Sequence, residues 1–247
     1  MRRRTTLALV AGGAAAAVAG AGAALARGRL AGRGPEGPLP DEDAYFTLYA
    51  PGGKYGFLAN GPVGWVIAKL MPVGEAGVYT AVAEVVDLQP DDELLDIGCG
   101  PGAFLAAKAQ HVRQVKGLDP SPTMLHAAER RLADRIAAGT ARLVAGSAAE
   151  LPFGDGEFTA VTAIFAPLSH AEAFRVLRPG GRLVHLDNDP RRSESEPASA
   201  WGRRRYDEAD HRRLFEDAGF TDVTIRYRGA PPLAGELLVS GRKPTAG

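Results

Sequence analysis

The chain has 247 residues, 45% of them hydrophobic and 23% charged, which is enough apolar material for one substantial core. Its 29 basic and 29 acidic residues cancel to a formal net charge of zero, so the overall charge does not indicate a nucleic-acid partner. Cys99 is the single cysteine, which excludes an intrachain disulfide framework and a thiolate zinc cluster, and no metal site is predicted.

The N-terminus carries three arginines, at positions 2–4, before an uncharged run over residues 5–26. Its length suits a membrane span, which needs about 20 residues, but alanine and glycine dominate, so its apolar driving force is weak. Residues 1–26 are predicted to be a hydrophobic anchor or signal-like segment. A cleaved export signal, an uncleaved anchor and a misassigned start all stay open. Residues 27–40, rich in Gly, Pro and Arg, are predicted to be a linker.

Residues 41–89 are predicted to form an N-terminal cap. An apolar pattern over residues 78–86 predicts a helix just before the first strand. Two interpretations of the aromatic residues in the cap stay open: they pack the cap onto the domain, or some of them line a substrate pocket. These aromatic residues are Tyr45, Phe46, Tyr49, Tyr55, Phe57 and Trp65.

The most informative stretch is residues 94–102, a short apolar run that ends in glycine at every second position. Its leucines and isoleucine suit a strand covered on both faces. Gly98, Gly100 and Gly102 remove the Cβ atoms where the backbone must turn into a helix that begins near Ala103. The amides of such a turn point at the helix N-terminus, where polar or anionic groups of a ligand are favoured. We interpret this turn as the cofactor end of the protein.

Strands and helices alternate downstream of the turn. The last two strands are joined by too few residues for a crossover helix, so they must form an antiparallel hairpin. The predicted fold is α/β: a Rossmann-like, doubly wound, mostly parallel seven-stranded sheet that ends in this hairpin, over residues 90–247. After the first strand, further strands are expected at 115–118, 142–145, 158–165, 182–186, 221–228 and 235–242, and helices at 103–111, 121–138, 170–177 and 207–218.

Two cofactor classes compete for the glycine turn. Gly98, Gly100 and Ala103 satisfy the dinucleotide pattern G-x-G-x-x-G/A, and Asp119 follows at the distance of a ribose-binding acidic residue. Four details argue against a dinucleotide. The third glycine comes one position early, Asp96 precedes the turn where it could meet a cationic amino group, a distinctive segment spans 146–153, and the sheet ends in a hairpin.

At these residues the sequence resembles the class I S-adenosylmethionine-dependent methyltransferases, particularly the small-molecule group that includes the ubiquinone and menaquinone biosynthesis enzymes. The resemblance covers about residues 78–243. It rests on the glycine motif together with the segments at 117–121, 151–158 and 175–183. It implies S-adenosylmethionine as the cofactor and a small molecule as the methyl acceptor.

The resemblance also implies a role for each cofactor-binding position. Asp96 would help hold the methionine end, and Asp119 would accept the two ribose hydroxyls, which suits a carboxylate with two acceptor oxygens. The family often has Asp where this chain has Ser147, which reaches less far toward the adenine amino group. The predicted cofactor-binding residues are Asp96, Gly98, Cys99, Gly100, Gly102, Asp119, Pro120, Ser121, Met124, Ser147, Ala148, Phe165 and Ala166.

The predicted mechanism is in-line transfer of the sulfonium methyl to an O, N or C atom of a small acceptor between the cap and the loop at 187–206. His170 is the candidate general base, with a helix-start or surface position as the alternative. A non-catalytic protein that binds the same cofactor, and more distantly an NAD-dependent oxidoreductase, are the alternative functions. Because the cofactor is made in the cytosol, we expect a cytoplasmic domain with membrane association through residues 5–26, with export left open. The oligomeric state is not predicted.

Overall fold

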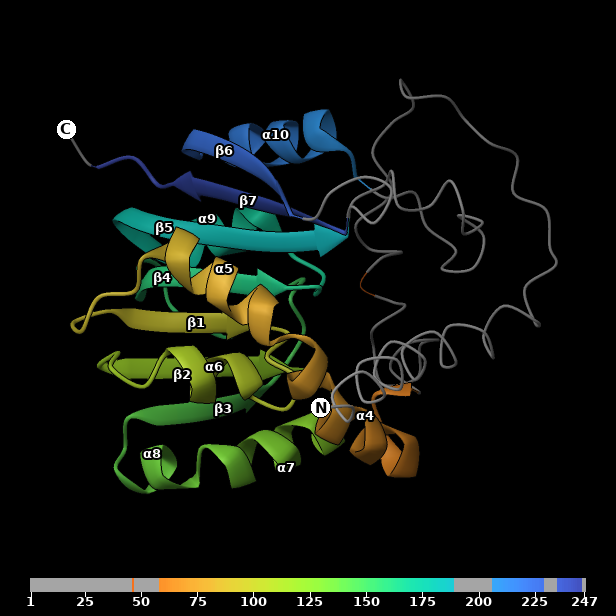
Figure 1. The fold of residues 1–247 in the computed structure, drawn as a ribbon. Coiled ribbons are helices and arrows are strands. Elements are labelled where there is room, and N and C mark those ends of the chain that lie inside the picture. The colour runs from red at the N-terminus through yellow and green to blue at the C-terminus, as the bar shows by residue number, and fades with distance from the viewer. Residues whose placement is uncertain (1–45, 47–57, 189–205, 229–234, 246–247) are drawn as a thin grey trace, which may run out of the picture.

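The computed structural model describes residues 46, 58–188, 206–228 and 235–245, and within them the chain forms a seven-stranded sheet. The strand order is β3-β2-β1-β4-β5-β7-β6, with β7 antiparallel to both of its neighbours and the other pairs parallel (Figure 1). The predicted fold class, including the closing hairpin, is confirmed. The strands are β1 (Glu93–Ile97), β2 (Gln114–Asp119), β3 (Ala141–Ala145), β4 (Phe158–Ile164), β5 (Leu177–Asn188), β6 (Thr221–Arg228) and β7 (Glu236–Arg242).

Helices cover both faces of the sheet, which explains why β1 reads as a continuous apolar run. Leu94 faces one core cluster with α5 and α6, and Leu95 faces the other with α9 and α10; neither is exposed. Side chains alternate between faces along a strand, so a strand inside a two-faced sheet needs apolar residues at consecutive positions. The helices are α4 (Gly61–Gly74), α5 (Ala76–Val86), α6 (Ala103–Lys108), α7 (Pro122–Arg131), α8 (Ala133–Ala137), α9 (His170–Val176) and α10 (Glu208–Asp217).

The helix predicted over residues 121–138 is two helices in the structure. Ser121 is the N-cap as predicted, and its hydroxyl accepts the N–H of Met124 at 3.2 Å. The helix breaks at Leu132, and the short α8 follows. Ile136, in α8, is 38% exposed, because the break ends the helical periodicity that would have turned it inward in one continuous helix.

Residues 179–181, which lie between the predicted helix at 170–177 and the predicted strand at 182–186, are part of β5. This strand begins at Leu177, and its pairing with β4 shifts register between Phe158 and Ala160, so the extra residues bulge while the strand continues. Gly180 has a φ of 79°, which is compatible with such an irregularity. The left-handed backbone of Gly180 therefore belongs to an irregularity in strand pairing and not to the end of helix α9.

The helix α5, which runs in front of the sheet in Figure 1, is fastened at its end by Arg182 of β5. Arg182 Nε donates to the carbonyl of Val86 at 2.7 Å, and the same guanidinium pairs with Asp92, whose side chain is almost fully buried. A buried charge pair with backbone partners fixes orientation. The helix is thereby held across β4, β5 and β7 with its first residues at the carboxyl ends of the parallel strands.

The cap prediction falls largely on residues that the structure does not describe. The described part of the cap consists of Phe46, residue 58 onward, α4 and α5. Residues 1–26, the linker at 27–40 and most of the loop at 187–206 lie outside the described residues. Among the described helices, none is by itself long and apolar enough to cross a membrane; the bent pair Gly61–Pro72 and Ala76–Val86 reaches the threshold by length and composition only.

Candidate active site at the carboxyl ends of the strands

The three glycines of the turn after β1 all adopt left-handed backbone conformations, with φ values of 67° at Gly98, 52° at Gly100 and 70° at Gly102. A Cβ atom on Gly98 would lie 2.3 Å from the Cβ of Ala166, so this position accepts no side chain. Among the described residues, the one atom within 4 Å of such a Cβ at Gly100 is Cε of Met71, at 3.9 Å. The turn thus packs tightly against the end of β4 at Gly98, whereas Gly100, although buried, leaves room for a side chain among the described residues.

The Asp119 carboxylate ties this turn to the end of β2. Its two oxygens accept the N–H of Gly100 and the N–H of Ser121, both at 2.8 Å. Burial raises the pKa of Asp119 to about 6, although the two amide hydrogen bonds lower it in part. Each oxygen keeps a further lone pair, so the carboxylate fits the predicted contact with ribose hydroxyls.

Asp96 lies in β1 beside the turn and is 2% exposed. Its partner is the hydroxyl of Thr162 on β4, which donates at 2.8 Å. Burial, with the charge of Asp119 as a smaller cause, raises the pKa of Asp96 to about 7. No cation pairs with Asp96 or Asp119 among the described residues. Two buried carboxylates without a protein cation suit a ligand that brings a positive charge, as the methionine end of S-adenosylmethionine does.

Three of the predicted cofactor-binding residues, Pro120, Ser121 and Met124, lie at the start of α7, where the cap meets the domain. Ser121 Oγ lies within hydrogen-bonding distance of the Ala59 carbonyl, at 2.7 Å, and of Asn60 Oδ1, at 2.9 Å. Met124 is buried, whereas Pro120 is partly exposed. The cap thus contacts Ser121, one of the predicted cofactor-binding residues.

Ser147 and Ala148 follow β3 in a short loop. Ser147 is exposed, and its hydroxyl accepts the N–H of Ala149 at 3.1 Å. The Ala148 side chain is buried in the core cluster beneath α9, which leaves only its backbone for a ligand. Glu150, which would compensate for the short serine only if the loop turns, forms a single bridge with Ser147.

Phe165 and Ala166 follow β4 at the same end of the sheet. Phe165 has a φ of 52°, which is rare for a residue with a side chain, and its N–H donates to the carbonyl of Leu186 at 2.8 Å. Ala166 packs on Gly98. These two residues therefore border both the glycine turn and the end of β5, as expected for residues between cofactor and acceptor.

His170 is the first residue of α9, as the helix-start alternative predicted, but it is not a surface residue. It is 4% exposed, and its ring packs edge-on against Phe215 and His185, with ring centroids 5.0 and 5.8 Å away. Burial lowers the pKa of His170 well below its ordinary value. Neither ring nitrogen has a hydrogen-bond partner among the described residues, so the structure brings His170 together with the core and not with the glycine turn. Its role as a base stays a prediction.

Cys99 lies inside the turn, and its thiol is buried. Burial, together with the charges of Asp119 and Asp96, raises the pKa of the thiol well above its ordinary value. A thiol held in its protonated form is a poor nucleophile, so Cys99 contributes small size rather than reactivity.

Glu75 and Tyr79, at the start of α5, are site residues that were not predicted from the sequence. The Tyr79 hydroxyl donates to Glu75 Oε2 at 2.5 Å, and the charge of Asp96 contributes to raising the pKa of Tyr79. The i,i+4 spacing of an acidic residue and a tyrosine at the start of a predicted helix was the available signal. Only the tertiary structure shows that the end of α4, which precedes this pair, lies beside the glycine turn, with Met71 Cε 3.9 Å from the position of a Cβ on Gly100.

Comparison with known proteins confirms the resemblance predicted from these residues. Residues 94–181 match a family model described as a methyltransferase domain. A demethylmenaquinone methyltransferase of Symbiobacterium thermophilum is 36% identical over 109 residues, which cover 40% of this chain and 43% of the relative. A nocamycin O-methyltransferase of Saccharothrix syringae is 36% identical over 130 residues, 44% of this chain and 46% of the relative. The chain thus spans about half the length of the curated relatives it matches.

Solved structures share the fold. A geranyl diphosphate C-methyltransferase from Streptomyces coelicolor, solved with S-adenosyl-L-homocysteine, superposes with a TM-score of 0.59 at 17% identity, covering 68% of this chain and 79% of that one. The S-adenosylmethionine cofactor predicted from the sequence agrees with this neighbour and with the family model. Residues 94–181 of the chain are therefore similar to a methyltransferase domain, and the sheet that contains them has the fold of the solved methyltransferase.

Proposed function

We propose that the protein transfers the methyl group of S-adenosylmethionine to an oxygen, nitrogen or carbon atom of a small-molecule acceptor. The observation that carries this proposal is the pair of buried carboxylates, Asp96 and Asp119, on the two sides of the glycine turn. The bound cofactor supplies an already activated methyl group, so its leaving group needs no acid.

The residues of the chain bind and orient the cofactor and the acceptor, and they exclude water from the reacting atoms. Asp96 attracts the amino group of the methionine end, Asp119 accepts the ribose hydroxyls, and the backbone around Gly100 lines the space between them. Phe165 and Ala166 form the border between the cofactor and the acceptor at the ends of β4 and β5. This division of work requires positioning rather than a covalent intermediate on the protein.

The acceptor is proposed to be a ring compound that carries a hydroxyl group. The names of two relatives support this class, since they are a nocamycin O-methyltransferase and an erythromycin 3''-O-methyltransferase. A screen of hydroquinones, phenols, amines and fatty acyl compounds, with release of S-adenosylhomocysteine as the signal, identifies the acceptor.

A binding titration with S-adenosylmethionine tests the proposal before any acceptor is known. Saturable binding supports it, and no saturable binding by the intact protein contradicts it. Saturable binding with no release of S-adenosylhomocysteine from any acceptor favours the non-catalytic alternative, for which the exposed Ser147 in place of a more usual Asp is the supporting observation. NADH in the same titration tests the oxidoreductase alternative.

We further propose that the domain works in the cytoplasm, where S-adenosylmethionine is made, and associates with the membrane through residues 5–26. Three exposed apolar side chains along α4, Val63, Val66 and Leu70, support contact with an apolar partner near the site. Protease digestion of intact and lysed cells separates the alternatives. Protection of the domain from external protease together with its recovery in the membrane fraction supports the proposal, whereas an exported domain that has lost its N-terminal arginines contradicts it.

A further inference from the structure

Glu75 occupies the junction between α4 and α5. It follows the last residue of α4 and is the N-cap residue of α5, and the axes of Gly61–Pro72 and Ala76–Val86 meet there at 66°. From this junction α5 runs in front of β4 and β5 toward the amino end of the sheet (Figure 1). Glu75 therefore lies at the carboxyl ends of the strands, on the side of α5, where a ligand of this fold is expected.

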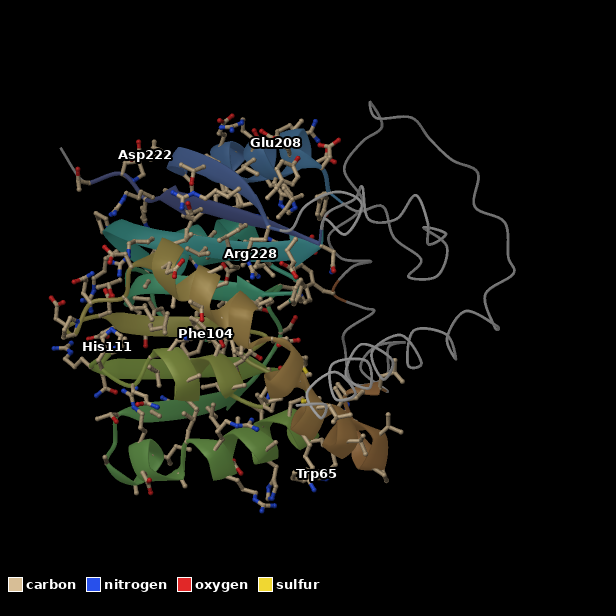
Figure 2. The ribbon with its side chains drawn as sticks, in the orientation of Figure 1. Trp65, Phe104, His111, Glu208, Asp222 and Arg228 are labelled. Carbon is tan, nitrogen blue, oxygen red and sulfur yellow. The ribbon has the colours of Figure 1, made fainter. Side chains whose placement is uncertain are left out.

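Tyr79 holds the Glu75 carboxylate in one position. Its hydroxyl donates to Glu75 Oε2 at 2.5 Å, and its ring is buried beside Phe104, with the ring centroids 6.0 Å apart. Phe104, labelled in Figure 2, lies on α6 in the same helix layer. Burial and the neighbouring Glu75 charge raise the pKa of Tyr79, so its hydroxyl stays protonated and remains a donor. Glu75 Oε1 has no donor among the described residues and is available to a ligand.

The surroundings of Glu75 lack a cation that would neutralise it. Within the described ranges no ion pair involves Glu75. The neighbouring charges belong to Glu236, at the start of β7, and to Arg228, at the end of β6, which pair with each other at 3.0 Å. Burial, and to a smaller extent the Glu236 charge, raise the pKa of Glu75, while the Tyr79 hydrogen bond lowers it in part. A carboxylate in such surroundings takes up a proton more readily than an ordinary glutamate.

The end of α4, next to Glu75, reaches the cofactor side. Met71, four residues before Glu75, has its Cε atom 3.9 Å from the position of a Cβ on Gly100 in the glycine turn. Glu75 is half-buried and still accessible, in contrast with His170, which is 4% exposed. Of the two candidate proton acceptors, Glu75 is the one that an acceptor molecule can touch.

We propose that Glu75, positioned by Tyr79, is the catalytic residue that receives the proton of the acceptor's hydroxyl group. The inference rests on the proposed methyl transfer and names the substrate class as a molecule with an ionisable hydroxyl. In this step the O–H bond of the acceptor breaks, the proton forms a new O–H bond on Glu75 Oε1, and the electron pair stays on the acceptor oxygen, which becomes the nucleophile.

The test measures single-turnover methyl transfer as a function of pH, with a series of acceptors from unsubstituted hydroquinone to the more acidic 4-nitrophenol. The full chain is compared with its Glu75→Gln, Glu75→Asp and Tyr79→Phe variants. Glu84→Gln is the matched control because Glu84 lies on the exposed face of the same helix. Affinity for S-adenosylhomocysteine is measured in parallel for every variant.

We expect Glu75→Gln to lower the transfer rate to hydroquinone about a hundredfold or more, the range of general-base catalysis, while Glu84→Gln changes nothing. The loss shrinks as the acceptor becomes more acidic, because an acceptor that ionises by itself does not need the base. Glu75→Gln removes the acid limb of the pH profile, and Glu75→Asp keeps it. Tyr79→Phe shifts this limb to higher pH, since the hydrogen bond that lowered the pKa of Glu75 is lost. Cofactor affinity stays within about twofold of the wild type in every variant.

Three results overturn the inference. One is a Glu75→Gln variant that keeps both the rate and the acid limb while the wild type transfers methyl groups. Another is a loss of equal size for all acceptors, which would mean a structural role. If Glu75→Gln does not fold, an unchanged acid limb in Tyr79→Phe has the same consequence. A wild type that binds the cofactor and methylates nothing rejects the proposed methyl transfer itself, together with this inference.

Discussion

The carboxylate of Asp119, at the end of β2, accepts the backbone N–H of Gly100, in the turn after β1, at 2.8 Å. This hydrogen bond joins the two segments whose spacing in the sequence indicated a cofactor site. It also means that Asp119 both shapes the turn and remains available for a ribose hydroxyl through its second lone pairs.

Replacing Asp119 by alanine removes both functions. We expect the dissociation constant for S-adenosylhomocysteine to rise about a hundredfold, since hydrogen bonds to a charged group contribute roughly 1.5–3 kcal/mol each. Isothermal titration measures the change. Asp134→Ala, at an exposed position on α8, is the control and should bind as the wild type does. Equal affinities in the two variants would show that Asp119 does not contact the ligand.

Gly98→Ala tests the close approach between the glycine turn and the end of β4. The new Cβ would lie 2.3 Å from the Cβ of Ala166 in a left-handed backbone conformation, so we expect a loss of about 2–4 kcal/mol in the free energy of unfolding. Gly139→Ala is the matched control, because Gly139 has a similar φ of 70° and a Cβ added there would have no atom within 4 Å. It should lose only about 1 kcal/mol from the backbone strain. Urea denaturation compares the two, and equal losses would refute the steric account.

The pH dependence of cofactor affinity reports the charge of Asp96. The pKa of this side chain is raised to about 7, so below pH 7 the donor's amino group must meet a protonated, neutral partner. Affinity should therefore fall as the pH decreases below 7, by up to about tenfold per pH unit, and more steeply below pH 6, where Asp119 also protonates. The Asp96→Asn variant should bind the cofactor weakly, and its affinity should lose the part of the pH dependence that begins at pH 7. A variant that keeps the full pH dependence would exclude Asp96 as the responsible group.

The buried histidines should make the fold sensitive to acid. Burial lowers the pKa of His170 and of His211, so both stay neutral in the folded protein while they protonate in the unfolded chain. Their contribution to stability is complete above about pH 6.5 and is lost as the pH falls below that value, at up to about 1.4 kcal/mol per pH unit for each histidine. The raised pKa values of Asp96 and Asp119 act in the opposite direction over about pH 7 to 4, because these groups bind protons in the folded state first.

His170→Phe isolates one histidine from this balance. The phenyl ring replaces the imidazole with another aromatic ring, so the packing on Phe215 is largely kept. The loss of unfolding free energy between about pH 7 and pH 5.5 should then be smaller than in the wild type by up to about 1.4 kcal/mol. Urea denaturation at the two pH values measures it. The same variant should keep its methyl-transfer rate if Glu75 is the base. A large loss of rate with an unchanged acid response would instead support the base role predicted for His170.

The fold and the cofactor half of the site could be predicted because their signals are local. The apolar run of β1, the glycine turn and Asp119 follow one another along the chain, and their spacing already limits the geometry. The break at Leu132 and the bulge near Gly180 were missed, because they depend on packing and strand pairing that no short window contains. The surface position considered for His170 was wrong, since a helix start can lie in the core when another helix covers it.

By itself, the sequence determined the order of strands and helices, the hairpin and the residues of the glycine turn, because hydrophobic periodicity and glycine placement act within a few residues. Only the tertiary structure decided which side chains meet at the carboxyl ends of the strands. It buried His170 against Phe215, joined the Tyr79 hydroxyl to the Glu75 carboxylate and brought the end of Met71 near Gly100. Such meetings depend on how separate elements pack across one sheet, and the packing is not encoded in any single stretch of the chain.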